Sequence, residues 1–226
     1  MNKNLNIIFE NENVFIIDKQ PNIDVLALYK QFIPVTSLDY EASGIVVFAK
    51  DENTYNFISN QFKKEQILKN YYVLVNGVMD NSEGEINKNL LVTEQTTSIS
   101  DKGIKAVTKY SVIEQFKNFA FVKVIPLTTR KNQIRTHFWA IGNTLAIDKI
   151  YGSDEPILLS NLKRRYKGIN KEKPLLKRLP MHLYKMELIL PKEKEKRIFT
   201  SALPEDFEVT LKQLRKYNKN SGAAFI

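Results

Sequence analysis

Three short segments contain side chains that could carry out acid–base or phosphate chemistry. The first is residues 37–44, where Asp39 lies ahead of Ser43, Gly44 and an apolar stretch. A carboxylate on a turn that enters a strand can be held in a fixed place by a rigid sheet. The same residue types also form ordinary Asx turns, in which the carboxylate bonds only its own backbone. The residues alone leave both interpretations open.

The other two segments place a phenol and two guanidinium groups beside predicted elements. Tyr71 begins an apolar run, where its hydroxyl could move a proton or simply lie at the rim of a core aromatic ring. Residues 130–135 hold Arg130 and Arg135 at the start of a predicted helix. Arginine and a helix N-terminus both favour an anion, either a phosphate or a carboxylate that must stay ionised. The alternative is a solvated basic turn.

The residue types that the chain lacks exclude several kinds of chemistry. Its 226 residues include no cysteine and only two histidines, His137 and His182. This excludes disulfides, thiolate zinc sites and cysteine nucleophiles, and a histidine-rich metal site is not expected. There is no glycine-rich phosphate loop, no apolar run near the roughly 20 residues of a membrane helix, and no secretory signal. We therefore predict a cytoplasmic protein with no metal, no cofactor and no membrane partner.

Positive charge is concentrated in one part of the chain. The net charge is +9, and residues 161–200 account for all of it, with 13 Lys and Arg against 4 Glu. A localised basic surface attracts a polyanion, most often nucleic acid, whereas the alternative is a solvated loop whose lysines aid solubility. The densest part comprises Lys163, Arg164, Arg165, Lys167, Lys171, Lys173, Lys177 and Arg178.

The elements that position these segments are mostly strands. We predict strands at residues 7–9, 14–17, 45–49, 71–75, 106–114, 119–125, 181–190 and 197–201, and helices at residues 24–32, 51–64, 130–141 and 204–216. In the helix over residues 51–64, Asp51 is the predicted cap, with Phe57, Ile58 and Phe62 facing inward. Strands outnumber helices and do not alternate regularly with them, which favours an α+β fold with a mixed, mainly antiparallel sheet.

Several motifs, taken together and in order, resemble those of the RluA-type pseudouridine synthases. Residues 6–19 are similar to the opening hairpin of that family, and Leu38-Asp39 with Ser43-Gly44 to its central motif His-Arg-Leu-Asp-x-x-Thr-Ser-Gly. Residues 69–77 are similar to Lys-x-Tyr-x-Ala-x-Val-x-Gly, and residues 126–137 to Pro-x-Thr-Gly-Arg-x-His-Gln-Ile-Arg-x-His. The closing Leu-Pro-x-Asp-Phe matches residues 203–207. The resemblance implies one catalytic domain over residues 1–226, with a basic insertion at about 153–179 and no separate N-terminal RNA-binding domain.

The resemblance also implies a reaction and its residues. Such enzymes are isomerases that detach a uracil from its ribose within RNA, rotate the base and rejoin it through carbon, without a cofactor. Asp39 would be the catalytic carboxylate, acting either as a nucleophile or on a ribose proton. Tyr71 would stack on the uracil and help move its proton, and Arg135 would pair with Asp39 and keep it ionised.

The remaining site predictions concern RNA contact. The substrate would be a structured tRNA or rRNA bound by a monomer, with the target base flipped out of its stack. The predicted RNA-binding residues are Thr36, Ser37, Arg130, Gln133, Ile134, Lys163, Arg164 and Arg165. Thr36-Ser37 replaces the family's His-Arg, and Ser37 is too short to fill the gap left by a flipped base. This departure leaves open slower catalysis, a substrate whose uridine is already exposed, or a non-catalytic RNA-binding or ribosome-assembly protein on the same fold.

Overall fold

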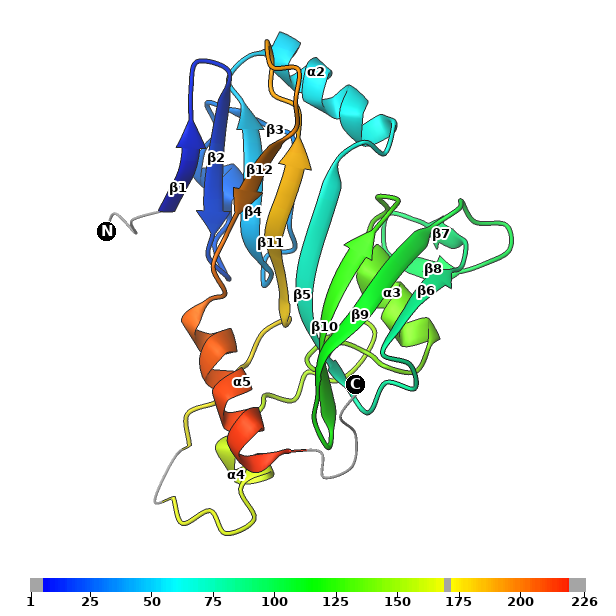
Figure 1. Cartoon of the computed structure of the whole chain (residues 1–226), viewed down its shortest axis with the longest axis vertical. Coiled ribbons are helices and arrows are strands. Elements are labelled where there is room, and N and C mark those ends of the chain that lie inside the picture. Colours follow the sequence, from blue (N-terminus) through cyan, green and yellow to red (C-terminus); the bar gives the residue numbers. More distant parts are fainter. Residues whose placement is uncertain (1–5, 169–171, 220–226) are drawn as a thin grey trace. The chain divides into compact units, whose positions relative to one another are not determined.

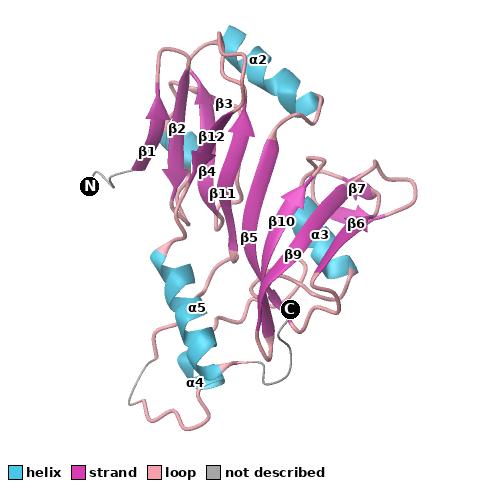
Figure 2. Cartoon of the chain, viewed as in Figure 1, coloured by secondary structure: helices cyan, strands magenta, loops and turns pink. Residues whose placement is uncertain are grey.

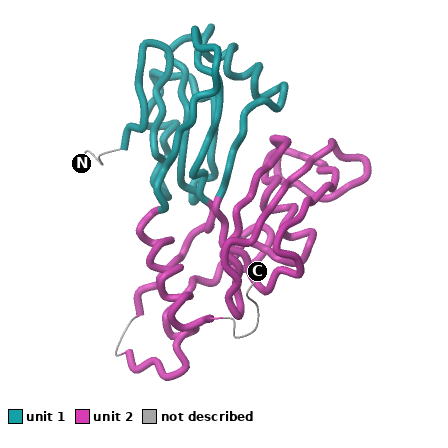
Figure 3. Tube along the Cα trace, in the orientation of Figure 1, with its two compact units in different colours: residues 1–71, 182–203 teal, residues 72–181, 204–226 magenta. Residues whose placement is uncertain are grey.

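The computed structural model describes residues 6–168 and 172–219. The chain divides into two compact units (Figure 3). Unit 1 comprises Met1–Tyr71 and His182–Leu203, and unit 2 comprises Tyr72–Met181 and Pro204–Ile226. Within the described residues, no helix is long and apolar enough to cross a membrane.

Unit 1 is built on a sheet (Figure 1) in which every residue of β2 and β4 is buried. The strand order is β1 (Asn6–Glu10), β2 (Val14–Lys19), β4 (Ser43–Ala49) and β11 (Met181–Leu188), followed by β5 (Leu68–Asn76). β12 (Arg197–Thr200) pairs with β11, and β3 (Ile33–Pro34) pairs with β4. The β4–β11 pair is parallel, while β1–β2 and β2–β4 are antiparallel.

The two helices of unit 1 agree in part with the sequence prediction. α2 (Glu52–Lys63) begins at Asp51, whose carboxylate accepts hydrogen bonds from Thr54 N and Oγ1 at 2.9 and 2.8 Å, so the predicted cap is confirmed. The prediction for Phe57 is wrong, because its side chain is 41% exposed and the buried face holds Thr54, Ile58 and Gln61. α1 (Val25–Leu28) is shorter than predicted, since the following residues turn so that Tyr29 and Phe32 pack on Phe15.

Unit 2 contains a second set of strands and three helices (Figure 2). β5 continues into this unit and precedes β10 (Phe119–Pro126), β9 (Val107–Gln115) and β6 (Glu83–Asn87) in strand order. β7 (Leu90–Val92) and β8 (Thr97–Ile99) form a separate hairpin, and the helices are α3 (Gln133–Ala140), α4 (Leu159–Leu162) and α5 (Glu205–Tyr217). The predicted α+β fold with a mixed, mainly antiparallel sheet is confirmed. The sequence analysis missed β6, β7 and β8; β6 and β8 are largely polar, and β7 is apolar but only three residues long.

Only part of the basic segment before β11 is exposed to solvent. Arg178, counted among the surface cations, is 2% exposed, and its guanidinium donates to both carboxylate oxygens of Asp206 at 2.7 Å. The neighbouring Leu176 and Leu179 are buried as well. The prediction for Arg178 is therefore wrong, because this arginine fastens the segment to the start of α5. Lys171 lies outside the described residues.

Candidate active site

Asp39 lies on a turn that leads directly into β4. Ala42 N donates to Asp39 O at 3.0 Å and closes the turn, while Asn22 N donates to Tyr40 O at 2.9 Å. Asp39 is half-buried, and the next residue, Tyr40, is 58% exposed. The Asp39 carboxylate is therefore carried by a hydrogen-bonded turn at the start of the buried strand β4.

A buried lysine holds this turn in place. Lys19, the last residue of β2, is 2% exposed, and its Nζ donates to the main-chain oxygens of Asp39, Tyr40 and Ala42 at 3.3, 2.8 and 2.6 Å. An ammonium group has three N–H donors, and a buried one has to be satisfied by hydrogen bonds. Lys19 therefore ties the backbone of the catalytic turn to the end of a core strand.

The residues after the turn are fixed by close backbone packing against β11. Gly44 has φ +118°, and a Cβ there would lie 2.3 Å from Leu183 O, so no other residue fits. Beside it, the buried Ser43 Oγ lies 3.0 Å from His182 Nδ1, and His182 Nε2 lies 3.2 Å from Ser201 O. Because a carbonyl only accepts, Nε2 carries the proton and Ser43 donates to Nδ1. The Ser-Gly pair of the motif thus anchors the turn to the parallel strand.

Tyr71 is a buried residue of unit 1 whose pKa depends on the charge of Asp39. Its pKa is raised, first by burial and then by the negative charge of Asp39. The phenol therefore keeps its proton at neutral pH. In this state the hydroxyl can donate a hydrogen bond or a proton, but it is a poor base.

The raised pKa of Tyr71 predicts a loss of stability in alkali. Above about pH 10 the unfolded tyrosine ionises while the folded one stays protonated, so the unfolded state is favoured by about 1.4 kcal/mol for each pH unit. Tyr71→Phe removes this proton and should lose less stability between about pH 10 and pH 12. Urea unfolding across this range measures the difference. If the unfolding free energy fell equally with pH in the wild type and in Tyr71→Phe, the pKa of Tyr71 would not be raised in the folded protein.

Removal of the Lys19 ammonium should destabilise unit 1 and slow the reaction. Lys19→Met removes the donor that joins the Asp39, Tyr40 and Ala42 oxygens, at an expected cost of about 2–4 kcal/mol. Lys50→Met is the matched control, because Lys50 forms a partly exposed ion pair with Glu10 and a cation–π contact with Phe32 at 5.7 Å, and it donates to no carbonyl oxygen of the Asp39 turn. Its loss should cost less than that of Lys19, about 1 kcal/mol. Thermal unfolding and kcat are the measurements. Similar effects from both variants would show that Lys19 does not hold the turn.

In unit 2, a buried hydrogen-bond network fixes the start of α3. Gln133 is 4% exposed, and its Nε2 donates to Val107 O and Thr108 Oγ1, both at 3.0 Å. Thr128 Oγ1 donates to Gln133 Oε1 at 2.8 Å and accepts from Val107 N at 3.0 Å. Thr108 also bonds His137 Nδ1, whose pKa is lowered by burial. Every polar atom of the Gln133 amide is used inside unit 2, so its side chain positions α3.

Arg135 forms a buried ion pair with a carboxylate that the sequence analysis gave no role. Its Nε and Nη2 donate to Asp148 Oδ2 and Oδ1 at 2.8 and 2.6 Å, and the Asp148 side chain is fully buried. Asp148 Oδ1 also accepts from the main-chain N–H groups of Ile150 and Tyr151 at 2.9 and 3.1 Å. Arg135 is therefore held rigidly by Asp148. The pairing of Arg135 with Asp39 that the resemblance implies stays a prediction.

The predicted RNA-binding residues differ in their surroundings. Ser37, Arg164 and Arg165 are exposed, and Thr36, Arg130 and Lys163 are half-buried. Thr36 Oγ1 accepts a hydrogen bond from Val47 N at 2.9 Å. Ile134, like Gln133, is buried, at 6% exposure, and the RNA-binding role of these two residues stays a prediction. The predicted helix over residues 130–141 begins only at Gln133, because Asn132 has φ +53° and breaks the helical backbone.

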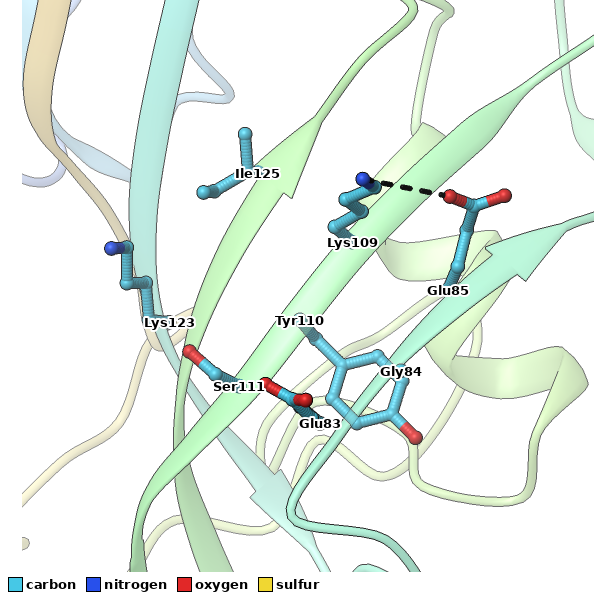
Figure 4. Close-up of a pocket in the computed structure, with 8 residues that line it drawn as sticks. All are labelled: Glu83, Gly84, Glu85, Lys109, Tyr110, Ser111, Lys123 and Ile125. Atoms are coloured by element: carbon cyan, nitrogen blue, oxygen red, sulfur yellow. Dashed lines mark ion pairs between the residues drawn. The ribbon is translucent and has the colours of Figure 1, made fainter.

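Unit 2 contains a hollow that is lined by residues of β6, β9 and β10. None of the predicted site residues lines it (Figure 4). Its lining residues are Glu83, Gly84, Glu85, Lys109, Tyr110, Ser111, Lys123 and Ile125. Lys109 lies 4.0 Å from Glu85, so acidic and basic side chains are mixed on this face.

Sequence analysis missed three residues that hold the candidate site. Lys19, Asp148 and His182 are all at most 2% exposed. Each is a polar residue within or at the end of an apolar run, and charged side chains are almost never fully buried unless they are paired. That contrast between a residue and its neighbours was the available signal.

Comparison with known proteins gives the family. The family model described as RNA pseudouridylate synthase matches residues 15–140 of this chain. Ribosomal large subunit pseudouridine synthase D of Blochmanniella floridana is 25% identical over 238 residues, covering 94% of this chain and 74% of the relative. The dual-specificity RNA pseudouridine synthase RluA of Vibrio cholerae is 30% identical over 127 residues, covering 54% and 52%. The solved structure of human RNA Pseudouridylate Synthase Domain Containing 4 has the same fold, with a TM-score of 0.70 at 20% identity over 93% of both chains.

The chain therefore belongs to the RNA pseudouridylate synthase family. Its curated relatives are of the RluA type, as the motifs predicted. The protein is an isomerase that forms pseudouridine in RNA.

Proposed function

We propose that this enzyme isomerises a specific uridine in a structured tRNA or rRNA, with Asp39 as the catalytic carboxylate. The observation that carries the proposal is the Lys19-held turn, which presents the Asp39 carboxylate close enough to influence the buried Tyr71 hydroxyl. A fixed carboxylate beside a buried, protonated phenol supplies an anion and a proton donor in one place. The names of bacterial relatives, which include two large-subunit pseudouridine synthases, support a ribosomal or transfer RNA.

The chemistry needs no oxidant, reductant or cofactor. The bond from the ribose to a uracil nitrogen breaks, the base rotates, and a new bond forms from the same ribose carbon to a uracil carbon. That uracil carbon then loses its proton and the freed uracil nitrogen gains one, so product and substrate contain the same atoms. Asp39 assists either by attacking the substrate or by taking a ribose proton. Tyr71 stacks on the base and donates a hydrogen bond to it, because its raised pKa makes it a donor.

The substitutions ahead of Asp39 bear on the choice of substrate. Ser37 is exposed and short, and the Thr36 hydroxyl already accepts a hydrogen bond from Val47 N. Neither side chain can fill the space of a base that has left its stack. We therefore propose a target uridine that is already unstacked, as in a loop, so that little unstacking energy is required. Arg130, Lys163, Arg164 and Arg165 would contact RNA phosphates, and Gln133 and Ile134 would position α3.

The organisation of the protein is part of the same proposal. Residues 1–226 contain one catalytic domain, and the basic segment at about 153–179 contributes to RNA binding. The enzyme acts as a monomer in the cytoplasm, where tRNA and ribosomes are found.

Chemical mapping of pseudouridine in total RNA tests this proposal. RNA is compared from cells that lack the gene and from the same cells complemented with the wild type or with Asp39→Ala. A tRNA or rRNA site that disappears on deletion and returns only with the wild type would support the proposal. A site restored by both proteins would refute the role of Asp39. An unchanged map would favour the non-catalytic alternative, in which Ser37 in place of arginine has removed activity on RNA.

A further inference from the structure

Two lysines from separate parts of unit 2 approach the same aromatic ring. Lys163, directly after α4, has its Nζ 5.7 Å from the centroid of the Tyr217 ring. Lys216, in the last turn of α5, has its Nζ 5.1 Å from the same centroid. Figure 1 shows α4 beside the C-terminal half of α5. The fold thus gathers two positive charges around one ring, although 53 positions separate them in the sequence.

This arrangement keeps an excess of positive charge. A cation–π contact at an exposed site stabilises by only about 0.5–1 kcal/mol and does not neutralise the ammonium group. Within the described part of the chain, neither Lys163 nor Lys216 pairs with a carboxylate. Among the acidic groups of unit 2, Asp206 binds Arg178, Glu114 binds Arg215, and Glu172 accepts from Ser160 N. The exposed Glu208 lies one turn before Lys212 on α5 and offsets part of the charge at that end.

Further cations extend the surface on both sides. Arg164 and Arg165 follow Lys163 and are exposed. Lys212 precedes Lys216 by one helical turn and is exposed on the same side of α5. We name this set the α4–α5 basic surface; it comprises Lys163, Arg164, Arg165, Lys212, Lys216 and Tyr217. It differs from the hollow on β6, β9 and β10, where Glu83 and Glu85 offset the charges of Lys109 and Lys123 (Figure 4).

We propose that the α4–α5 basic surface binds the phosphate backbone of the substrate RNA. The ammonium groups of Lys163 and Lys216 lie 5.7 and 5.1 Å from the centroid of the Tyr217 ring, so they are at most about 11 Å apart and phosphates of one RNA strand can contact both. The inference rests on the proposed function and adds α5 to the RNA-binding part of the enzyme. Because phosphates carry no sequence information, this surface contributes affinity and orientation but not the choice of uridine.

The test compares two double variants with the same change in charge. Lys163→Gln with Lys216→Gln removes two cations from the surface, whereas Lys194→Gln with Lys196→Gln removes two exposed lysines from unit 1. Binding is measured from about 50 to 200 mM salt, with a tRNA transcript and an unstructured RNA of equal length as probes. Loss of two phosphate contacts should lower the magnitude of the slope of log K against log salt by about 1.5. The ratio of wild-type to variant affinity should therefore fall roughly eightfold between about 50 and 200 mM salt.

The expected result is a lower slope on both RNAs for Lys163→Gln with Lys216→Gln, and a smaller change for the unit 1 pair. Equal slopes for the two double variants would overturn the proposal, because binding would then depend only on net charge. Tyr217→Leu should also lower the slope while leaving both lysines in place; an unchanged slope would exclude the ring from the site. Pseudouridine formation is assayed separately, so a surface that binds RNA without product formation would refute the proposed function and not this surface.

Discussion

Asp39→Asn is expected to lower the rate of pseudouridine formation at least about a thousandfold while the protein stays folded. Asparagine has nearly the same shape but cannot ionise, so it can neither attack the substrate nor accept a proton. The turn should survive, because Lys19 binds the main-chain oxygens of residues 39, 40 and 42. Single-turnover assays on the RNA identified by mapping measure the loss, and circular dichroism checks the fold.

Glu41→Gln is the matched control for this prediction. It removes a carboxylate from the same turn, two residues after Asp39, and should keep nearly full activity. Asp39→Asn should also lower the pKa of Tyr71, since the charge that helps to raise it is gone; ultraviolet titration of the tyrosines detects this. Equal losses of activity from the two variants would show that the negative charge of the turn matters, and not the Asp39 carboxylate itself.

The sequence was informative where local patterns and tertiary packing agree. The strands β2, β4 and β10 are mainly apolar runs, and they were predicted to within two residues of either end. β6, with the sequence Glu-Gly-Glu-Ile-Asn, has only one buried residue and exists through its pairing with β9. Such an edge strand has no apolar pattern of its own, so sequence alone could not reveal it.

The same limit applies to the candidate site. Asp39 and Tyr71 were found because motif residues stand close together in the sequence and in a fixed order. Lys19 and Asp148 act across 20 and 13 positions, and a side chain's partner at that range depends on how the chain folds back. Arg178 illustrates the opposite error, since a run of cations hid the one arginine that is buried against Asp206.

Arg135→Met is expected to destabilise unit 2 by about 3–5 kcal/mol, because it leaves the fully buried Asp148 carboxylate without its counter-ion. If Arg135 also serves the chemistry, kcat per folded molecule should fall at least about tenfold while KM for RNA changes little. Urea unfolding and steady-state kinetics at a temperature where the variant is folded measure the two effects.

Arg178→Met separates stability from catalysis, because it breaks a similar arginine–aspartate pair in the same unit. The Asp206 side chain is 37% exposed and can be hydrated once it is alone, so this variant should lose less stability than Arg135→Met. Neither Arg178 nor Asp206 belongs to the proposed catalytic residues, so kcat per folded molecule should stay near that of the wild type. A fall in kcat that follows the stability of both variants would make Arg135 a purely structural residue. A fall confined to Arg135→Met would show that Asp148 holds this arginine in place for the reaction.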